Sequence, residues 1–340
     1  MKFGVVGYGT GGQHFHAPFI AAARGCELGG VVARAPATVA KVRADLPGTP
    51  VFASLGEMLA AGVDVVTITT PPETRRDLVL EAIAAGVNVI ADKPFAPSAA
   101  AARDLAQAAR DKGVTLGVYH NRRWDADIRT LKKVVEDGGI GTPWRLHSRM
   151  DFDDPATLEP GPTGGLLRDL GSHVVDQALY VLGPVLSVDA QLDCHDLPAG
   201  RTDVGFCLTL RHESGAHSHL SASKLNFLNQ RELRIYGSGG SYVANGTDVQ
   251  AQAIFAGKRP ADDLEGWGYD AEEHWGTLRN AAGTRQVPSE QGAYFRYYEA
   301  FAEAIRSGTP PPVTAEEGIA VLAVLDAARE SAETGRTVTL

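Results

Sequence analysis

The 340-residue sequence lacks several features that define large classes of proteins. Its three cysteines, Cys26, Cys194 and Cys207, form no CxxC pair and have no metal-ligand spacing with histidine, so neither a disulfide framework nor a structural zinc is expected. No apolar run approaches the roughly 20 residues that span a bilayer, and the N-terminal stretch has no signal-peptide pattern. These absences predict a soluble, cytoplasmic protein.

Positive charge is also scarce. Lys and Arg total 32 against 41 Asp and Glu, so the formal net charge is −9, and no block of basic residues occurs. An acidic surface of this kind argues against nucleic acids and anionic membranes as partners. Hydrophobic residues make up 44% and charged residues 21% of the chain, close to globular averages, and the length predicts about two domains.

The first 120 residues alternate between predicted strands and helices. Short apolar or β-branched runs predict strands at 2–6, 28–33, 63–69, 87–91 and 114–119. Helices are predicted from the glycine-rich loop to about Arg24, at 37–45, after a Ser54/Glu57 capping box, at 73–85, and from a Ser98 cap to Gly113. This alternation predicts parallel βαβ units in a doubly wound α/β sheet, where ligands bind at the carboxyl ends of the strands.

Four unusual loops follow these strands and would therefore meet at one edge of the sheet. They are Gly7–Gly12, Thr69-Thr70-Pro71-Pro72, Asp92-Lys93-Pro94 and Tyr119-His120-Asn121-Arg122-Arg123. A scattering of surface loops would not produce this convergence, so the functional site is predicted at this edge.

The pattern Gly7-x-Gly9-x-x-Gly12, with Thr10 and Gly11 inside it, lies between the first strand and the first helix. In a dinucleotide-binding loop the first glycine allows a tight turn, the second lets the backbone approach the pyrophosphate, and the third permits close helix packing. A glycine turn without a ligand is the alternative, because the chain contains 38 glycines. The position of the motif favours dinucleotide binding.

Residues 28–44 contain no acidic side chain that could bind the ribose 2′-hydroxyl of NAD. They contain Arg34, Lys41 and Arg43, with Thr38 one helical turn after Arg34. A guanidinium can bind a 2′-phosphate bidentately and stack on adenine, so this pattern favours NADP, with NAD possible. The alternative is that Arg34 is a solvated loop charge.

Lys93 follows an apolar strand, and Pro94 disfavours the α conformation at Lys93, which keeps the lysine extended at the end of the strand. An ammonium beside an oxidised, cationic nicotinamide would give up its proton more readily, which suits proton transfer. An ordinary surface lysine is the alternative.

Residues 164–183 predict a helix in which Asp169, His173, Asp176 and Tyr180 share one stripe. A histidine flanked by carboxylates could be an oriented general base. A solvated polar face and a metal site are the alternatives, and the metal site has too few ligands to be favoured. Gly171 inside this helix predicts close approach of another group, such as a cofactor or a strand.

Together these motifs resemble the Gfo/Idh/MocA family of nicotinamide-dependent oxidoreductases over nearly the whole chain. Gly7–Gly12 matches the family's phosphate loop, and Asp92-Lys93-Pro94 matches its Glu-Lys-Pro signature, in which the lysine is catalytic and its bond to proline is often cis. Residues 164–176 match the loop and helix that bear the active-site Asp and His. Asp92 replaces the commoner Glu, and Pro72 and Arg75 replace Asn and His, so contacts near the nicotinamide ribose are expected to differ.

Other stretches resemble the branch of NADP-dependent scyllo-inositol dehydrogenases and related sugar dehydrogenases, namely residues 16–18, 119–125, 169–173 and 312–314. The resemblance implies a Rossmann dinucleotide-binding domain at 1–120. It implies a substrate-binding and oligomerisation domain at 121–340, with an open, mostly antiparallel sheet and helices on one face. Strands are expected at 204–211 and 231–236, and a Thr314/Glu317 capping box is expected to begin a late helix. Family members often pair through the open sheet, so a homodimer or homotetramer is expected.

The resemblance also implies hydride transfer between a polyol or sugar carbon and NADP, without a metal. His173 would act as general base, Lys93 would stabilise or relay the proton of the same oxygen, and Asp169 would orient the substrate. Asp176 would orient the imidazole or bind substrate. The residues expected near substrate also include Arg122 and Trp124. Those expected at the cofactor are Gly7, Gly9, Thr10, Gly11, Gly12, Arg34, Thr38, Thr70, Pro71, Asp92, Lys93 and Asn121.

Two other functions follow from the same resemblance. Some relatives are glycosidases that use NAD transiently, with no net oxidation. Another relative is a regulator that binds NAD(P) without catalysis. The presence of Lys93, Asp169 and His173 together argues against the regulator, because a sensor does not need them.

Overall fold

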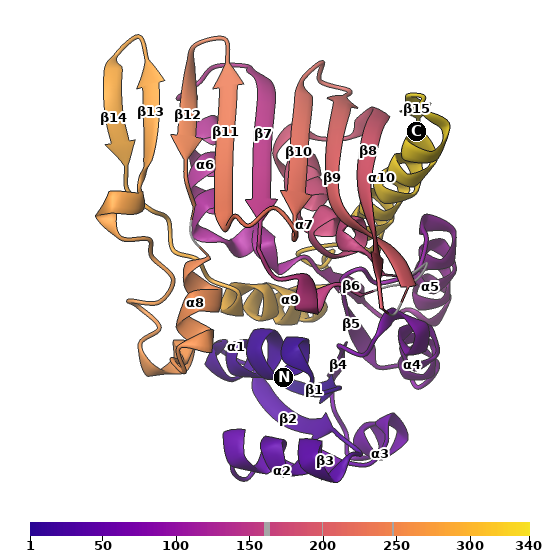
Figure 1. The fold of residues 1–340 in the computed structure, drawn as a ribbon. Helices are drawn as coiled ribbons and strands as arrows, with labels where there is room; N and C mark the ends of the chain where they lie inside the picture. Colours follow the sequence, from indigo (N-terminus) through magenta and orange to yellow (C-terminus); the bar gives the residue numbers. More distant parts are fainter. Residues whose placement is uncertain (160–163, 199, 247) are drawn as a thin grey trace. The chain divides into compact units, whose positions relative to one another are not determined.

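The chain folds into two compact units in the computed structural model, which describes residues 1–159, 164–198, 200–246 and 248–340 (Figure 1). The first unit contains Met1–Asn121, Gln250–Trp267 and Ala293–Ile319, and the second contains Arg122–Val249, Gly268–Gly292 and Ala320–Leu340. Two late segments of the chain therefore fold with the N-terminal unit. Among the described residues, no helix is both long and apolar enough to cross a membrane.

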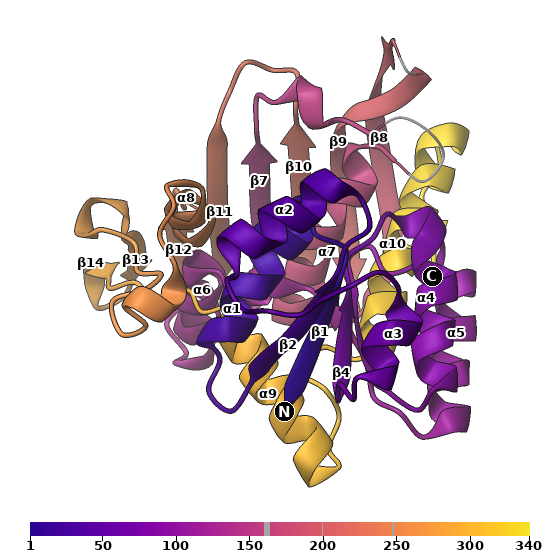
Figure 2. The same ribbon diagram turned by 90° about the horizontal axis from the view of Figure 1, so that it is seen from below.

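A six-stranded, all-parallel sheet forms the core of the first unit. Its strand order is β3-β2-β1-β4-β5-β6, with helices on both faces (Figure 2). The strands are β1 (Lys2–Val6), β2 (Glu27–Val32), β3 (Val51–Phe52), β4 (Val65–Ile68), β5 (Asn88–Asp92) and β6 (Leu116–Tyr119). The predicted doubly wound sheet is confirmed; the short β3 was not predicted.

Two helices of the first unit, α3 (Leu55–Ala60) and α5 (Ala99–Lys112), begin at the predicted serine caps. The Ser54 and Ser98 hydroxyls accept hydrogen bonds from the backbone N–H groups of Glu57 and Ala101, both at 3.2 Å. The Glu57 carboxylate accepts from the N–H of Ala53, not of Ser54, so the capping box is displaced by one residue. The helices are α1 (Ala17–Ala22), α2 (Pro36–Asp45), α3 (Leu55–Ala60), α4 (Pro72–Ala84), α5 (Ala99–Lys112), α8 (Val249–Phe255) and α9 (Phe295–Ser307).

The first helix differs from the continuous helix predicted to run to about Arg24. Its opening segment, Gly11–His16, is a π-helix, and α1 ends at Ala22 because Ala23 is extended. Pro18 has no N–H to bond to the preceding turn, and its ring needs space there, so the turn before it widens. Accordingly, the N–H of Ala17 bonds to the carbonyl of Gly12, five residues back.

A nine-stranded sheet forms the core of the second unit, in the order β14-β13-β12-β11-β7-β10-β9-β8-β15. Every pairing is antiparallel except that of β7 with β10, and α6 (Ala126–Glu136) and α7 (Leu166–Leu182) lie behind the sheet in Figure 1, as expected. The strands are β7 (Pro143–Asp151), β8 (Val185–Leu197), β9 (Gly200–His212), β10 (His217–Ser223), β11 (Gln230–Gly237), β12 (Gly240–Ala244), β13 (Gly276–Asn280), β14 (Gly283–Val287) and β15 (Val338–Thr339).

The long helix α10 (Ala315–Thr334) begins in the first unit and continues into the second. Its predicted capping box is complete. The Thr314 hydroxyl accepts from the N–H of Glu317 at 3.1 Å, and the Glu317 carboxylate accepts from the N–H of Thr314 at 2.8 Å. Two of the four unpaired donors at this end are therefore satisfied by side chains.

A carboxylate from a strand of the sheet caps the first turn of helix α7. Asp203 of β9 accepts a hydrogen bond from the backbone N–H of Leu167 at 2.6 Å, which places a negative charge at the positive end of the helix. A Cβ on Gly165 would collide with this carboxylate and lie 2.6 Å from its Cγ. A Cβ on Gly171 would lie 3.1 Å from Leu167 and 3.5 Å from Leu325 of α10, so the close approach predicted at this glycine is made by another helix.

Gly165→Ala is expected to destabilise the protein more than Gly183→Ala. Both glycines flank α7 in the same region of positive φ and ψ near 180°, at φ 89°, ψ 160° and φ 83°, ψ −167°, so the backbone cost is matched. Only Gly165 also faces the Asp203 carboxylate, so the added methyl group should lower the free energy of unfolding by about 1–3 kcal/mol more through overpacking. Urea unfolding of both variants measures the difference; equal destabilisation would contradict this role of Asp203.

Candidate active site

The glycine loop after β1 packs against the loop after β4, at the point where the strand order of the parallel sheet reverses. Gly7 has φ +98°, and a Cβ on it would lie 3.0 Å from the Thr69 hydroxyl and 3.3 Å from the Thr70 methyl. The Thr69 hydroxyl donates to the carbonyls of Val6 and Gly7, at 3.2 and 3.1 Å. Open α/β sheets bind ligands at this reversal point.

The other two glycines of the motif differ in the space around them: Gly12 is crowded and Gly9 is open. A Cβ on Gly12 would collide with the carbonyl of Gly7, so the start of the π-helix can approach the strand end only without a side chain. No atom lies within 4 Å of the Cβ position of Gly9. The loop is closed on the protein side and open where a backbone must approach a pyrophosphate, so these residues fit a dinucleotide.

Lys93 follows the last residue of β5, and the Lys93–Pro94 bond is cis, as the resemblance implied. The Lys93 N–H donates to Asp92 Oδ1 at 2.8 Å, and Asp92 Oδ2 lies 3.1 Å from the Cβ position of Gly11. The segment with the lysine and the glycine loop are therefore in contact. Burial alone would raise the pKa of Asp92, but the neighbouring charges of His16, Arg75 and Lys93 hold that pKa below its ordinary value.

A fully buried histidine, which sequence reasoning gave no role, supports the Asp92 carboxylate. His16 Nε2 lies 3.4 Å from Asp92 Oδ2, and His16 Nδ1 lies 2.7 Å from the hydroxyl of Tyr298. Its ring stands 4.1 Å from the ring of Tyr119 at the end of β6. The branch-specific residues 16–18 thus include a side chain that connects α9 to the aspartate beside Lys93.

Arg75 ties the loop after β4 to the segment that holds Lys93. The guanidinium is 3% exposed and donates to the carbonyls of Thr70 at 2.6 Å and of Asp92 at 2.7 Å, and also to that of Pro94. The sequence predicted only that contacts at this position would differ from those of the family. The structure shows that the difference is a clamp on the backbone at both sides of the lysine.

Arg75→Met is expected to lower the free energy of unfolding by about 2–4 kcal/mol, because three part-buried carbonyls lose a buried, charged donor. Its neighbour provides a matched control. Arg76 is half exposed and pairs with the exposed Asp77, so Arg76→Met should change the stability by less than about 0.5 kcal/mol. Denaturant unfolding of both variants decides; equal stabilities would show that Arg75 clamps nothing.

The other predicted cofactor residues lie at or after the carboxyl ends of strands in the first unit. Arg34 is exposed and comes two residues after β2, and Thr38 follows on α2. Lys41 donates to the side chain of Gln13 at 3.1 Å, and Arg43 of α2 is exposed, as Arg34 is. The remaining predicted positions in this group are Thr10 and Pro71, both exposed, and Asn121, which is buried.

In the second unit, the polar stripe of α7 turns inward. His173 is 6% and Asp176 1% exposed, so the solvated-face alternative is wrong for both. The Asp169 side chain is 44% exposed, and its Oδ2 lies 3.0 Å from the ammonium of Lys224. Lys224 follows β10, 55 residues further along the chain. No periodicity or motif of the sequence could have indicated this pair.

Asp176 is held by an arginine that sequence reasoning did not assign to it. Arg123 Nε lies 3.1 and 3.0 Å from the two carboxylate oxygens, and Nη2 lies 2.7 Å from Oδ1. Both side chains are almost wholly buried, and the guanidinium also stands 4.8 Å from the Tyr180 ring centre. That Asp176 orients the imidazole or binds substrate stays a prediction.

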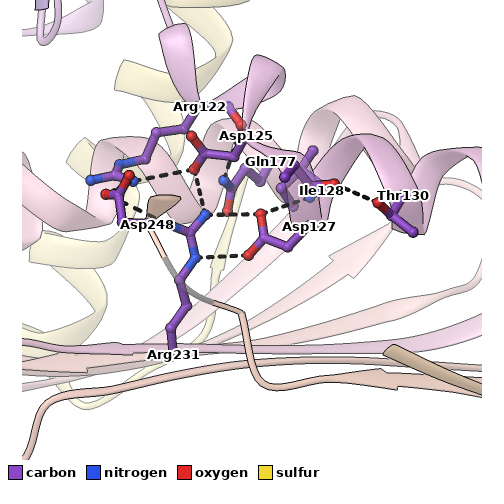
Figure 3. A network of polar contacts seen from close by, with 9 residues as sticks. Arg122, Asp125, Asp127, Ile128, Thr130, Gln177, Arg231 and Asp248 are labelled. Atoms are coloured by element: carbon purple, nitrogen blue, oxygen red, sulfur yellow. Dashed lines mark hydrogen bonds and ion pairs between the residues drawn. The ribbon is translucent and has the colours of Figure 1, made fainter. Parts of the chain in front are cut away.

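Arg122 belongs to a buried network of charges (Figure 3). Its Nη1 lies 2.6 Å from Asp248 and 3.2 Å from Asp125, and Arg231 pairs with Asp125 and, at 2.8 Å, with Asp127. Burial raises the pKa of Asp127 to about 6, opposed by Arg231 and assisted by Asp125. The predicted contacts of Arg122 and of the half-buried Trp124 with substrate stay predictions.

Comparison with known proteins decides the family. Residues 1–120 match the NAD-binding Rossmann-fold domain of the Gfo/Idh/MocA oxidoreductases, and residues 132–340 match their C-terminal α/β domain. The chain belongs to the Gfo/Idh/MocA family. This Gfo/Idh/MocA protein is therefore an NAD(P)-binding oxidoreductase.

Relatives of the protein span its full length. It is 34% identical to the NADP(+)-dependent scyllo-inositol 2-dehydrogenase IolW of Bacillus subtilis, over 100% of this chain and 96% of IolW. The solved structure of the oxidoreductase yvaA from B. subtilis has a TM-score of 0.90 at 33% identity, covering 100% of this chain and 98% of that one. A 1,5-anhydro-D-fructose reductase of Ensifer adhaerens is 28% identical over 81% of this chain and 79% of its own length.

Proposed function

We propose that this protein is an NADP-preferring dehydrogenase that transfers a hydride between a hydroxyl-bearing carbon of a polyol or sugar and the nicotinamide. The observation that carries the proposal is the meeting of two loops in the first unit. The glycine loop, closed at Gly12 and open at Gly9, contacts the segment that ends in Lys93 at the reversal point of a parallel sheet. The names of IolW and of the anhydrofructose reductase support an inositol, aldose or anhydrosugar as substrate.

Arg34 supports the preference for NADP over NAD. It is exposed just after β2, and residues 28–44 offer no carboxylate for a ribose 2′-hydroxyl. IolW, which the chain resembles over its full length, is named as NADP(+)-dependent. Gly7–Gly12, Thr70, Pro71 and Asn121 would hold the rest of the dinucleotide, and when bound the nicotinamide accepts or returns the hydride.

The chain's own polar residues carry the proton and position the substrate. The His173 imidazole takes the proton of the reacting hydroxyl as general base. The Lys93 ammonium hydrogen-bonds the same oxygen and stabilises its developing negative charge. Asp169 accepts hydrogen bonds from substrate hydroxyls, which suits a neutral, hydroxyl-rich ligand. Residues 1–120 thus serve the cofactor and residues 121–340 the substrate.

The same family membership supports a further proposal about the protein's state. The open sheet of the second unit would pair with a second copy, which gives a homodimer or homotetramer. Separately, the three cysteines, which form no disulfide framework, support a reducing, cytoplasmic location.

Lys93→Met is expected to lower kcat by at least about 100-fold, because the developing negative charge on the reacting oxygen loses its cationic hydrogen-bond donor. The assay follows NADPH or NADH formation with inositols, aldoses and anhydrosugars, and the reverse reaction with keto-sugars. NADPH affinity, measured by fluorescence titration, should be largely unchanged. Lys112→Met, at the exposed end of α5, is the matched control and should leave all parameters unchanged.

Three outcomes contradict the proposal. Unimpaired turnover by Lys93→Met removes the catalytic role of the lysine. Binding of both cofactors without turnover in either direction favours a non-catalytic regulator. Release of a free sugar from a glycoside without net cofactor reduction favours a glycosidase with transient oxidation.

A further inference from the structure

A buried lysine lies beside the carboxylate of α7 that the proposed function assigns to the substrate. Lys224 is the first residue after β10, and its backbone N–H donates to the carbonyl of Val204 on β9 at 3.0 Å. Its ammonium donates to the Thr157 hydroxyl at 2.7 Å and to Asp169 Oδ2 at 3.0 Å. The backbone bond fixes where the lysine leaves the sheet, and the two side-chain bonds fix its charged end.

The pair is asymmetric in its exposure. The Lys224 side chain is 7% exposed, whereas the Asp169 side chain is 44% exposed. A lysine is rarely buried to this extent unless its charge is paired, because removing an ammonium from water is costly. A carboxylate exposed to this extent does not need a buried partner for its own solvation. The buried lysine therefore needs the aspartate to compensate its charge. The aspartate is the member of the pair that is exposed.

We propose that Lys224 is a positioning residue that holds Asp169 as an ionised hydrogen-bond acceptor for substrate hydroxyls. This inference rests on the proposed function, because it takes Asp169 as the group that receives the substrate. The Lys224 ammonium donates a hydrogen bond to one carboxylate oxygen of Asp169. A second hydrogen bond, to the Thr157 hydroxyl, fixes the orientation of the ammonium. An oriented acceptor binds hydroxyl groups without the loss of rotamer freedom that an unrestrained aspartate would suffer.

The arrangement also bears on the class of substrate. Lys224 and Asp169 together carry no net charge, and the outermost group is the acceptor. A neutral polyol or sugar can donate hydroxyl hydrogens to this carboxylate. A sugar acid would bring a second carboxylate toward it, which is unfavourable. The pair therefore selects uncharged, hydroxyl-rich substrates over sugar acids.

A double-mutant cycle tests the role of Lys224. Lys224→Met should raise KM for the polyol or sugar about tenfold or more, because a charged partner of the acceptor is lost. The change in kcat should be smaller, and the NADPH affinity should stay that of the wild type. In an Asp169→Asn background, Lys224→Met should have little further effect, because the residue acts through Asp169. Lys224→Arg, which keeps a cation, should recover part of the affinity.

Two controls separate this role from a general loss of structure. Lys133→Met removes an exposed lysine that also pairs with an aspartate, Asp137, and should leave KM and kcat unchanged. If Lys224→Met does not fold, Thr157→Val is the alternative variant. Thr157 is exposed, and its replacement removes one of the two hydrogen bonds of the Lys224 ammonium. It should raise KM several-fold in the wild-type background and leave KM unchanged in the Asp169→Asn background.

The outcomes distinguish this inference from the proposed function. Wild-type turnover with an unchanged KM in Lys224→Met overturns the role of Lys224 and leaves the proposed function standing. Equal effects of Lys224→Met in both Asp169 backgrounds also overturn it, because the lysine would then act independently of the aspartate. Absence of wild-type turnover with every polyol and sugar in both directions overturns the proposed function and, with it, this role.

Discussion

The parallel pairing of β1 with β4 brings the Gly7–Gly12 loop against Thr69 and Thr70, and the first unit's candidate site depends on that contact. The loop can close only because Gly12 has no side chain to collide with the carbonyl of Gly7. Arg75 then links Thr70 to the backbone on both sides of Lys93. A displacement of the loop after β4 would therefore reach the lysine segment through the buried Arg75 guanidinium.

The second unit positions α7 by a different means. Its polar groups meet charged side chains from other segments: Asp203 receives the first-turn N–H of Leu167, Lys224 holds Asp169, and Arg123 holds Asp176. Buried charges are tolerated only when each has a partner with good geometry, so these pairs also restrict how the helix can lie on the sheet.

Most features that the sequence encodes locally were predicted, and features that depend on residues far apart in the chain were not. The strands of the first unit other than β3, the Ser54, Ser98 and Thr314 caps and the helix at Leu166–Leu182 are encoded within ten to twenty neighbouring residues, and the sequence predicted them. The π-helical turn before Pro18 was missed because helical periodicity does not distinguish the two helix types. The partners of the Asp92, Asp169 and Asp176 carboxylates come from distant segments and follow no period, so only the structure could identify His16, Lys224 and Arg123. The association of residues 250–267 and 293–319 with the N-terminal unit also has no local signal.

The central claim is that the protein moves a hydride between a hydroxyl-bearing carbon and NADP with net oxidation. The most direct test is to incubate the protein with NADP and a polyol or sugar carrying deuterium on its hydroxyl-bearing carbons, and to follow the label by NMR. The account predicts deuterium at C4 of the nicotinamide and an equal amount of oxidised product. Label that stays on the sugar, or a cofactor that ends unlabelled and unreduced, would contradict it.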